Sequence, residues 1–189
     1  VEEEQREQTK KRNKLLYQSE HDELTGLYNK RSLNRYLEDV FEACKLNEKE
    51  LGILFLDIDY FKQLNDRYGH GKGDEGICAV ADALKKIFPE DYVARYGGDE
   101  FLVVMTGRDL TYVMEHAESL CAGIRECKIP NEDSEVESWL TISVGGVCAI
   151  PKEPNRVWDF LSAADNTLYE QKKEQKGKVR FYQGEGKYL

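Results

Sequence analysis

Two short acidic stretches, far apart in the chain, carry side chains that could bind a metal ion. Asp57 and Asp59 directly follow the apolar run 51–56, which predicts a strand buried on both faces. Alternation along a strand places both carboxylates on one side, at the strand end where α/β sheets bind ligands. The second stretch is Asp99-Glu100. Acids that end a strand are common in proteins, so each stretch taken alone leaves a purely structural role open.

A glycine pair precedes the second acidic stretch. Gly97 and Gly98 separate the apolar segments 92–94 and 101–105, a pattern that predicts a β-hairpin. A two-residue primed turn requires positive φ angles, which glycine adopts without steric cost. The missing Cβ atoms would also let a bulky anionic ligand approach the backbone. The two acids would then lie at the mouth of the hairpin, with a solvated structural turn as the alternative.

The segment after the first acidic stretch carries polar side chains that suit a guanine nucleotide. A short helix is expected to begin near Tyr60, where its free N–H groups and Lys62 favour a phosphate. Asn65 offers a donor and an acceptor, and Asp74 accepts two N–H donors, which matches the edge of guanine but not that of adenine. Taken singly, Asn65 and His70 could equally serve a turn, and Asp74 could cap the helix that follows.

Hydrophobic spacing predicts the elements that position these residues. Apolar positions recur with helical periodicity in four segments, 33–44, 75–88, 110–124 and 157–168. Strand patterns cover 51–56, the two arms of the hairpin, 140–150 and 179–181. Because strands alternate with helices, we expect an α/β sandwich with one antiparallel hairpin.

The same residues spell out the motifs of a known family. Residues 97–101 read GGDEF, residues 57–74 read DIDYFKQLNDRYGHGKGD, and residues 22–31 read DELTGLYNKR. The chain therefore resembles the GGDEF (diguanylate cyclase) family over residues 21–182. The resemblance implies an α/β (α+β) fold with a palm-like, nucleotidyl-cyclase version of the ferredoxin-type core. Its central mixed sheet of about five strands has helices on both faces, and the Asp57 strand lies beside the GGDEF hairpin.

The resemblance implies that the chain is a diguanylate cyclase, which condenses two GTP into cyclic di-GMP and pyrophosphate. The implied cofactor is Mg²⁺ or Mn²⁺, two ions per GTP. Each of two facing domains would supply one GTP, so the expected partners are GTP, a second GGDEF domain and an upstream sensor or regulatory module. The alternative is a regulatory module that binds GTP or a protein without turnover. Because Asp57, Asp99 and Glu100 are all present, the enzyme is favoured.

The resemblance also assigns roles to residues at matching positions. The metal ligands are expected to be Asp57, the Ile58 carbonyl, Asp99 and Glu100. Asp99 and Glu100 are also the expected catalytic acids, and Asp99 stands where the family has its general base. The guanine ligands are expected to be Asn65, His70 and Asp74. The phosphate ligands are expected to be the Tyr60 and Phe61 backbone, Lys62 and Lys172, with Lys176 or Lys178 replacing an arginine that the family has near its C-terminal end.

Many members of this family bind their product at an inhibitory site through an RxxD motif just before the hairpin. Asp91 stands at the Asp position, but Phe88 replaces the arginine. An apolar ring cannot donate a hydrogen bond to phosphate or guanine. We therefore predict that this inhibitory product site is absent or badly weakened.

Length and composition bound the remaining possibilities. The 189 residues predict one GGDEF domain, 21–189, after a polar stalk helix, 1–20, and the chain begins at Val1, so we expect a signalling output domain cut from a longer protein. The net charge of −9 argues against binding a nucleic-acid polymer. No run approaches the roughly 18 apolar residues of a membrane span, so no direct membrane contact is expected. The five cysteines show no CxxC spacing, which favours reduced thiols in the cytoplasm, or in the cytoplasmic portion of a membrane-anchored protein.

Overall fold

The computed structural model describes residues 2–183, which form six helices and five strands. The helices are α1 (Glu2–Glu20), α2 (Lys30–Leu46), α3 (Phe61–Tyr68), α4 (His70–Ile87), α5 (Leu110–Glu126) and α6 (Val157–Glu174). The strands are β1 (Leu51–Ile58), β2 (Tyr92–Arg95), β3 (Glu100–Thr106), β4 (Ile142–Ala149) and β5 (Val179–Phe181). The predicted helices and strands are all found.

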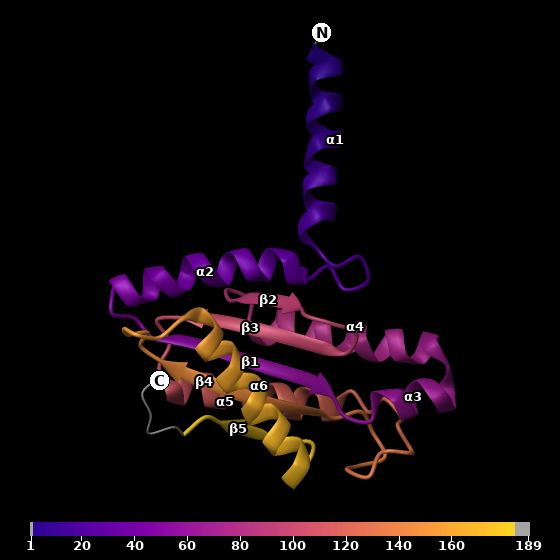
Figure 1. Ribbon diagram of the computed structural model, residues 1–189. Helices are drawn as coiled ribbons and strands as arrows, with labels where there is room; N and C mark the ends of the chain where they lie inside the picture. Colours follow the sequence, from indigo (N-terminus) through magenta and orange to yellow (C-terminus); the bar gives the residue numbers. More distant parts are fainter. Residues whose placement is uncertain (1, 184–189) are drawn as a thin grey trace.

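The strands form one mixed sheet in the order β2-β3-β1-β4-β5. Strand β1 lies at the centre, antiparallel to both β3 and β4, whereas β5 runs parallel to β4 at the edge. Helices α2 and α6 cover one face of the sheet, and α4 and α5 cover the other (Figure 1). Every residue of β1 is buried, which confirms the predicted central strand and the α/β sandwich.

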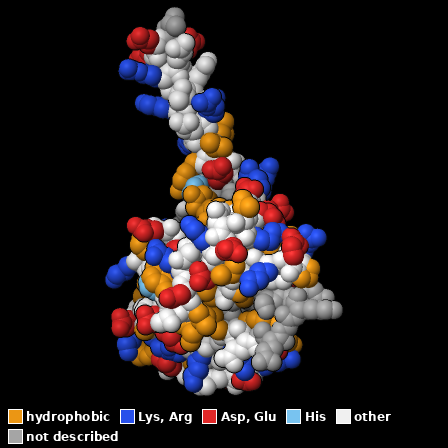
Figure 2. All heavy atoms as spheres, turned by 90° about the vertical axis from the view of Figure 1, so that its left-hand side faces the viewer, with side chains coloured by type: hydrophobic (Ala, Val, Ile, Leu, Met, Phe, Trp, Pro, Cys, Tyr) orange, Lys and Arg blue, Asp and Glu red, His pale blue; other side chains and the backbone are white. Residues whose placement is uncertain are grey.

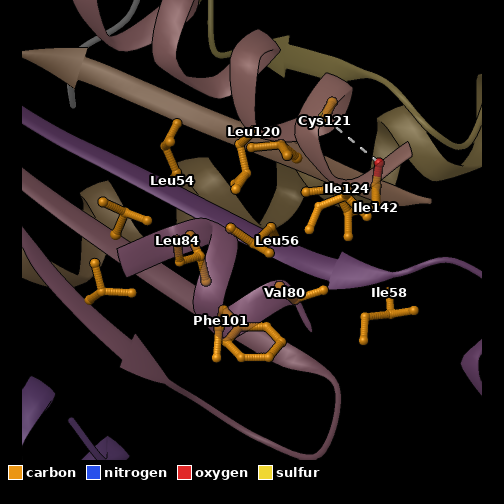
Figure 3. Close-up of a cluster of buried hydrophobic side chains, with 14 of the residues drawn as sticks. Leu54, Leu56, Ile58, Val80, Leu84, Phe101, Leu120, Cys121, Ile124 and Ile142 are labelled. Atoms are coloured by element: carbon orange, nitrogen blue, oxygen red, sulfur yellow. Dashed lines mark hydrogen bonds between the residues drawn. The ribbon is translucent and has the colours of Figure 1, made fainter. Parts of the chain in front are cut away.

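Side chains of β1 alternate between two hydrophobic clusters. Leu54 and Leu56 belong to the cluster formed with α4 and α5, which is drawn in Figure 3. Ile53 and Phe55 belong to the opposite cluster, formed with α2 and α6. Complete burial of such a side chain is worth about 1.5–3 kcal/mol. The strand that carries Asp57 near its end is therefore a rigid base for a functional site.

The apolar periodicity predicted a helix that begins at residue 75, whereas α4 begins at His70. The helix was expected to start at Glu75, with His70 weighed as a residue of the preceding turn. In the structure, Gly69 has a φ of 86° and reverses the chain directly after α3, so that the next helix starts at once. Asp74 lies inside α4, which excludes the alternative in which it only caps that helix.

Helix α1 projects from the sheet as a solvated stalk (Figure 1). Side chains of both charge signs line its length, and hydrophobic side chains gather at its foot (Figure 2). Among the latter, Leu15, Leu16 and Tyr17 are each more than half exposed. No helix within residues 2–183 combines the length and the hydrophobicity needed to cross a bilayer.

A column of stacked rings joins the foot of the stalk to the sheet. Tyr17 stacks on His21 with 3.9 Å between ring centroids, and His21 stacks on Tyr28 at 4.5 Å. The column continues from Tyr28 to Tyr92 of β2 at 4.2 Å and from Tyr92 to Tyr36 of α2 at 3.9 Å. Each aromatic pair is worth about 0.5–1.5 kcal/mol beyond its buried area. The stalk is thus attached to the hairpin through side chains as well as through the peptide chain.

Candidate active site

The two acidic stretches meet where β1 and the β2–β3 hairpin end side by side. In the antiparallel pairing of β1 with β3, Asp57 lies opposite Glu100. The N–H of Ile58 donates to the carbonyl of Asp99 at 3.2 Å, which fixes the hairpin loop beside the end of β1. Residues that are distant in sequence therefore form one acidic edge, as expected from the resemblance.

The loop of the hairpin differs from the predicted two-residue turn. The N–H groups of Tyr96 and Gly97 both donate to the Glu100 carbonyl, at 2.8 and 3.3 Å, and residues 96–99 lie between the strands. Neither glycine has a positive φ, so the predicted reason for the glycine pair is wrong. A Cβ at Gly97 would lie 2.7 Å from Glu100 Oε2, so a larger residue there would displace the Glu100 carboxylate. Gly98 is exposed and has open space around it.

Asp57 is a buried carboxylate whose two oxygens have different surroundings. Its residue is only 9% exposed, and Oδ2 accepts a hydrogen bond from Lys172 Nζ of α6 at 2.5 Å. Oδ1 is buried and has no partner in the part of the chain that the structure describes. Burial raises the pKa of Asp57 to about 6 against the effect of Lys172, and the charges of Asp99 and Asp59 add to the rise. A desolvated acid with a free oxygen is typical of a functional site.

The other two acids of this edge are desolvated as well. Burial raises the pKa of Asp99, and the charge of Lys172 opposes this rise. Burial raises the pKa of Glu100, the charges of Asp99 and Asp165 add to the rise, and Lys172 and Lys30 oppose it. Asp165 was not predicted as a site residue, because it reaches the acids only through the packing of α6 on the sheet.

The acidic edge fits a hard divalent cation that takes part of its ligands from water and substrate. Carboxylate and carbonyl oxygens are the ligands that Mg²⁺ prefers, and Asp57 Oδ1 is a free buried acceptor. Across residues 2–183, no group of three or more His, Cys, Asp and Glu side chains is close enough to hold a metal ion. Lys172, predicted to contact phosphate, places its ammonium on Asp57. Mg²⁺ sites commonly use one or two carboxylates plus substrate phosphates, and this edge can supply such a set.

The predicted guanine ligands lie on α3 and α4, which meet at Gly69. Asn65 Oδ1 is buried and unpartnered among the described residues. It lies against Gly73, where a Cβ would be 1.9 Å away, so a larger residue there would displace the Asn65 side chain. His70 and Asp74 are exposed and, at a spacing of four residues, share a face of α4. This corner offers a buried amide acceptor and an exposed acid to a ligand with several N–H donors.

The predicted phosphate ligands surround the start of α3. Tyr60 precedes the helix in a left-handed conformation, with φ at 52°, and the helix begins at Phe61. Its first N–H groups therefore have no partner within the helix. Lys62 is exposed in the first turn. The Lys176 ammonium lies 4.3 Å from the centre of the Tyr60 ring, which favours Lys176 over Lys178 as the replacement for the arginine of the family.

Arg95 is a residue of this site whose role the sequence reasoning missed. Its guanidinium donates to the carbonyls of Gly97 and Gly98 and to the carboxylate of Asp22. Asp22 also accepts the N–H and the hydroxyl of Thr25, at 2.9 and 2.7 Å. Although burial opposes the shift, these hydrogen bonds and the Arg95 charge hold the pKa of Asp22 below its usual value. An arginine directly before a glycine loop was the available signal, because such a loop leaves its carbonyls unpaired.

The surface predicted to lack an inhibitory site is built around Phe88 and Asp91. Phe88 is 1% exposed and belongs to the cluster under α4 and α5, so its ring faces the core. Asp91 is half-buried, and burial raises its pKa. The absent or weakened product site stays a prediction, with an apolar ring in place of the arginine.

A sequence profile described as "Diguanylate cyclase, GGDEF domain" matches residues 19–178. The chain belongs to the GGDEF domain family. The match begins at the last residues of the stalk. The matched part of this GGDEF domain contains both acidic stretches and the corner between α3 and α4.

Relatives of this GGDEF domain agree with the family assignment. A protein of Escherichia coli K12 described as "Probable diguanylate cyclase DgcC" is 33% identical over 161 residues, or 85% of this chain and 42% of that protein. A Caulobacter vibrioides protein described as an uncharacterized signaling protein is 30% identical over 182 residues, or 95% of this chain and 22% of that protein. The chain thus spans less than half the length of these curated relatives.

Solved structures confirm the GGDEF fold. The coiled coil and GGDEF domain of DgcB from Caulobacter crescentus, in complex with c-di-GMP, matches with a TM-score of 0.85 at 24% identity, covering 94% of this chain and 93% of that one. Diguanylate cyclase SiaD from Pseudomonas aeruginosa, in complex with its activator SiaC, matches with a TM-score of 0.75 at 27% identity. That match covers 94% of this chain and 68% of SiaD.

Proposed function

We propose that this GGDEF domain is a diguanylate cyclase, which condenses two GTP into cyclic di-GMP and releases pyrophosphate. The observation that carries the proposal is the environment of Asp57. This buried acid lies opposite Glu100 and beside the loop of Asp99, with one oxygen on Lys172 and the other without a partner. The description of the DgcC relative as a probable diguanylate cyclase supports the same reaction.

The guanine base would bind at the corner between α3 and α4. The free Oδ1 of Asn65 would accept an N–H of the base, and the Asp74 carboxylate would accept N1–H and N2–H, with His70 alongside. Adenine has no N1–H, so an acid facing adenine would lose a partner. Asp74 therefore favours GTP over ATP and disfavours a mixed cyclic dinucleotide as product.

The triphosphate would lie between the start of α3 and the acidic edge. The free N–H groups at Phe61 and Lys62, together with the Lys176 ammonium, would hold the β- and γ-phosphates. Two Mg²⁺ or Mn²⁺ ions would be held by Asp57, the Ile58 carbonyl and Asp99, with Glu100 as a further ligand. The chemistry that they would supply is polarisation of the α-phosphate and neutralisation of the pyrophosphate.

Proton transfer would fall to the acid on the hairpin loop. Burial raises the pKa of Asp99, which makes its carboxylate a better proton acceptor for a 3′-hydroxyl. Arg95 holds the carbonyls of the neighbouring glycines and thereby fixes the loop. Lys172 contributes positive charge next to Asp57, where negative charge would otherwise accumulate around the phosphates.

Each domain supplies one GTP and therefore half of the reaction, so two copies must face each other. The stalk α1 is suited to control this encounter. Its foot carries the exposed Leu15, Leu16 and Tyr17, and it is tied to the hairpin through the stacked rings and the Arg95–Asp22 pair. An upstream sensor or regulatory module acting through the stalk would then set the activity.

The second candidate is a regulatory module that binds GTP, or a protein partner, without turnover. Two observations favour it: Lys172 sits on Asp57, and no cluster of three metal-binding side chains is found across the described residues 2–183. Both candidates predict GTP binding at the same corner. They differ in whether pyrophosphate is released.

Incubation with GTP, ATP and Mg²⁺, followed by chromatography of the products, separates the candidates. The proposal predicts cyclic di-GMP from GTP alone, at a rate per chain that rises with protein concentration. Asp57→Asn should abolish product, whereas the matched control Asp66→Asn, which removes an exposed acid of α3, should retain it. GTP binding without pyrophosphate release at high protein concentration would instead establish the regulatory module.

A further inference from the structure

A buried polar network lies next to the phosphate side of this site. Asp59 is the first residue after β1 and is 0% exposed. Its carboxylate accepts hydrogen bonds from the hydroxyls of Thr141, at 2.8 Å, and Ser143, at 2.6 Å. Its N–H donates to the Thr141 carbonyl at 2.9 Å. Asp59 was expected to lie on the same side as Asp57, but its two oxygens are both engaged by hydroxyls at the start of β4.

Ser143 extends this network to the turn between α6 and β5. While its O–H donates to Asp59, its oxygen accepts the N–H of Gly177 at 2.9 Å. Gly177 has a φ of 78°, and a Cβ there would lie 2.8 Å from Val136 and 3.0 Å from Arg125. Arg125 also donates to the Gly177 carbonyl. This turn is therefore held in one position by hydrogen bonds on both sides of a residue that must be glycine.

The turn carries the cation that lies at the start of α3. Lys176 directly precedes Gly177, and its ammonium lies 4.3 Å from the centre of the Tyr60 ring. Tyr60 in turn directly follows Asp59. The contacts thus form a closed ring that runs through Asp59, Tyr60, Lys176, Gly177 and Ser143 and returns to Asp59.

We propose that Asp59 and Ser143 are positioning residues for the triphosphate, because they hold Lys176 beside the ring of Tyr60, the residue that precedes α3. The identity of the ligand rests on the proposed function, whereas the network itself does not. Neither residue needs to touch substrate. Phosphate binding from two separate segments requires that the segments keep a fixed separation, and the closed ring provides it.

Two hydroxyl deletions separate positioning from stability. Ser143→Ala breaks the link to Gly177, whereas Thr141→Val removes the other hydroxyl donor of Asp59 and leaves that link intact. The probe is 3′-deoxy-GTP with Mg²⁺, which has no attacking hydroxyl and so binds without turnover, and guanosine is the probe without phosphates. Ser143→Ala should weaken 3′-deoxy-GTP binding about three- to tenfold, the effect of one hydrogen bond. Guanosine binding should not change in either variant, and Thr141→Val should weaken 3′-deoxy-GTP binding less than Ser143→Ala does.

A double-mutant cycle tests whether Ser143 acts through Lys176. Lys176→Ala should weaken 3′-deoxy-GTP binding by itself, and adding Ser143→Ala should then lower the affinity by less than about twofold. Additive losses, or equal losses of 3′-deoxy-GTP and guanosine binding, would overturn the inference.

Hydrogen exchange at the Gly177 amide needs no ligand and keeps this inference distinct from the proposed function. Exchange should be faster in Ser143→Ala than in Thr141→Val, because only the first variant frees this N–H. Equal exchange in the two variants would overturn the network. If the wild type failed to bind 3′-deoxy-GTP, the proposed function would fail and the positioning role with it, whatever the exchange shows.

Discussion

The raised pKa of Asp57 predicts how the stability of the fold changes with pH. Burial raises this pKa from 3.8 to about 6, with Lys172 opposing the rise. A shift of about two units corresponds to about 3 kcal/mol, at roughly 1.4 kcal/mol per unit. Because the pKa is raised in the folded state, the contribution of protonated Asp57 to the free energy of unfolding is fully present below about pH 4. This contribution is lost as the pH rises through about 6.

The variant Asp57→Asn tests this reasoning, since an amide cannot ionise. Urea unfolding without Mg²⁺ at a series of pH values gives the free energy of unfolding of both proteins. The variant-minus-wild-type difference should rise by about 3 kcal/mol between about pH 4 and pH 8. Loss of the Lys172 pair changes the absolute difference, so the pH dependence is the test. A difference that stays constant or falls with rising pH would refute the assignment of Asp57 as a buried, desolvated acid.

Asp22→Asn is the matched control with the opposite sign. Despite burial, hydrogen bonds from Thr25 and the Arg95 charge hold the pKa of Asp22 below its usual value. Its contribution to stability is therefore present above its usual pKa and lost as the pH falls. With rising pH, the difference in the free energy of unfolding between variant and wild type should fall for Asp22→Asn, whereas it should rise for Asp57→Asn.

Three further outcomes are expected. Gly73→Ala would place a Cβ 1.9 Å from Asn65 Oδ1 and should weaken 3′-deoxy-GTP binding at least tenfold, because the base would lose Asn65 as a ligand. The circular dichroism spectrum should be retained, and an unchanged affinity would contradict guanine binding at the corner between α3 and α4. Gly145→Ala would bring a Cβ within 2.3 Å of the α6 backbone and should lower the free energy of unfolding by about 3–5 kcal/mol. Gly146→Ala would meet an aromatic side chain that can move and should lower the free energy of unfolding by about 1–3 kcal/mol. If urea unfolding ranked the two losses in the reverse order, the packing of α6 on β4 would be refuted. Cyclic di-GMP titrated in Ca²⁺, which allows binding without turnover, should show no submicromolar binding at the Phe88 surface, and protection of the amides there would contradict this prediction.

Much of the fold could be predicted because local pattern and global packing agree along this chain. The continuous apolar run before Asp57 can be accommodated only in a strand covered on both faces, which is where β1 lies. The helical periodicities identified the packed faces of α2, α5 and α6 for the same reason. The meeting of Asp57 with Glu100 followed from the family resemblance, because strand pairing between distant segments is not encoded in local spacing.

Features that depend on tertiary contacts could not be predicted. The close approach of Gly97 to the Glu100 carboxylate depends on the fold of this loop, which turn statistics do not contain. The early start of α4 follows the positive φ of Gly69, which reverses the chain after α3, despite the poor helix propensity of the glycines that follow. The pairing of Lys172 with Asp57 arises only once α6 crosses the sheet.

The most direct test of the central claim is the anomalous scattering of Mn²⁺ in crystals grown with 3′-deoxy-GTP. We expect Mn²⁺ within ligand distance of the carboxylates of both Asp57 and Asp99, with the base at Asn65 and Asp74 and with Lys172 released from Asp57. Nucleotide bound with Asp57 still paired to Lys172 and no metal at this edge would contradict it.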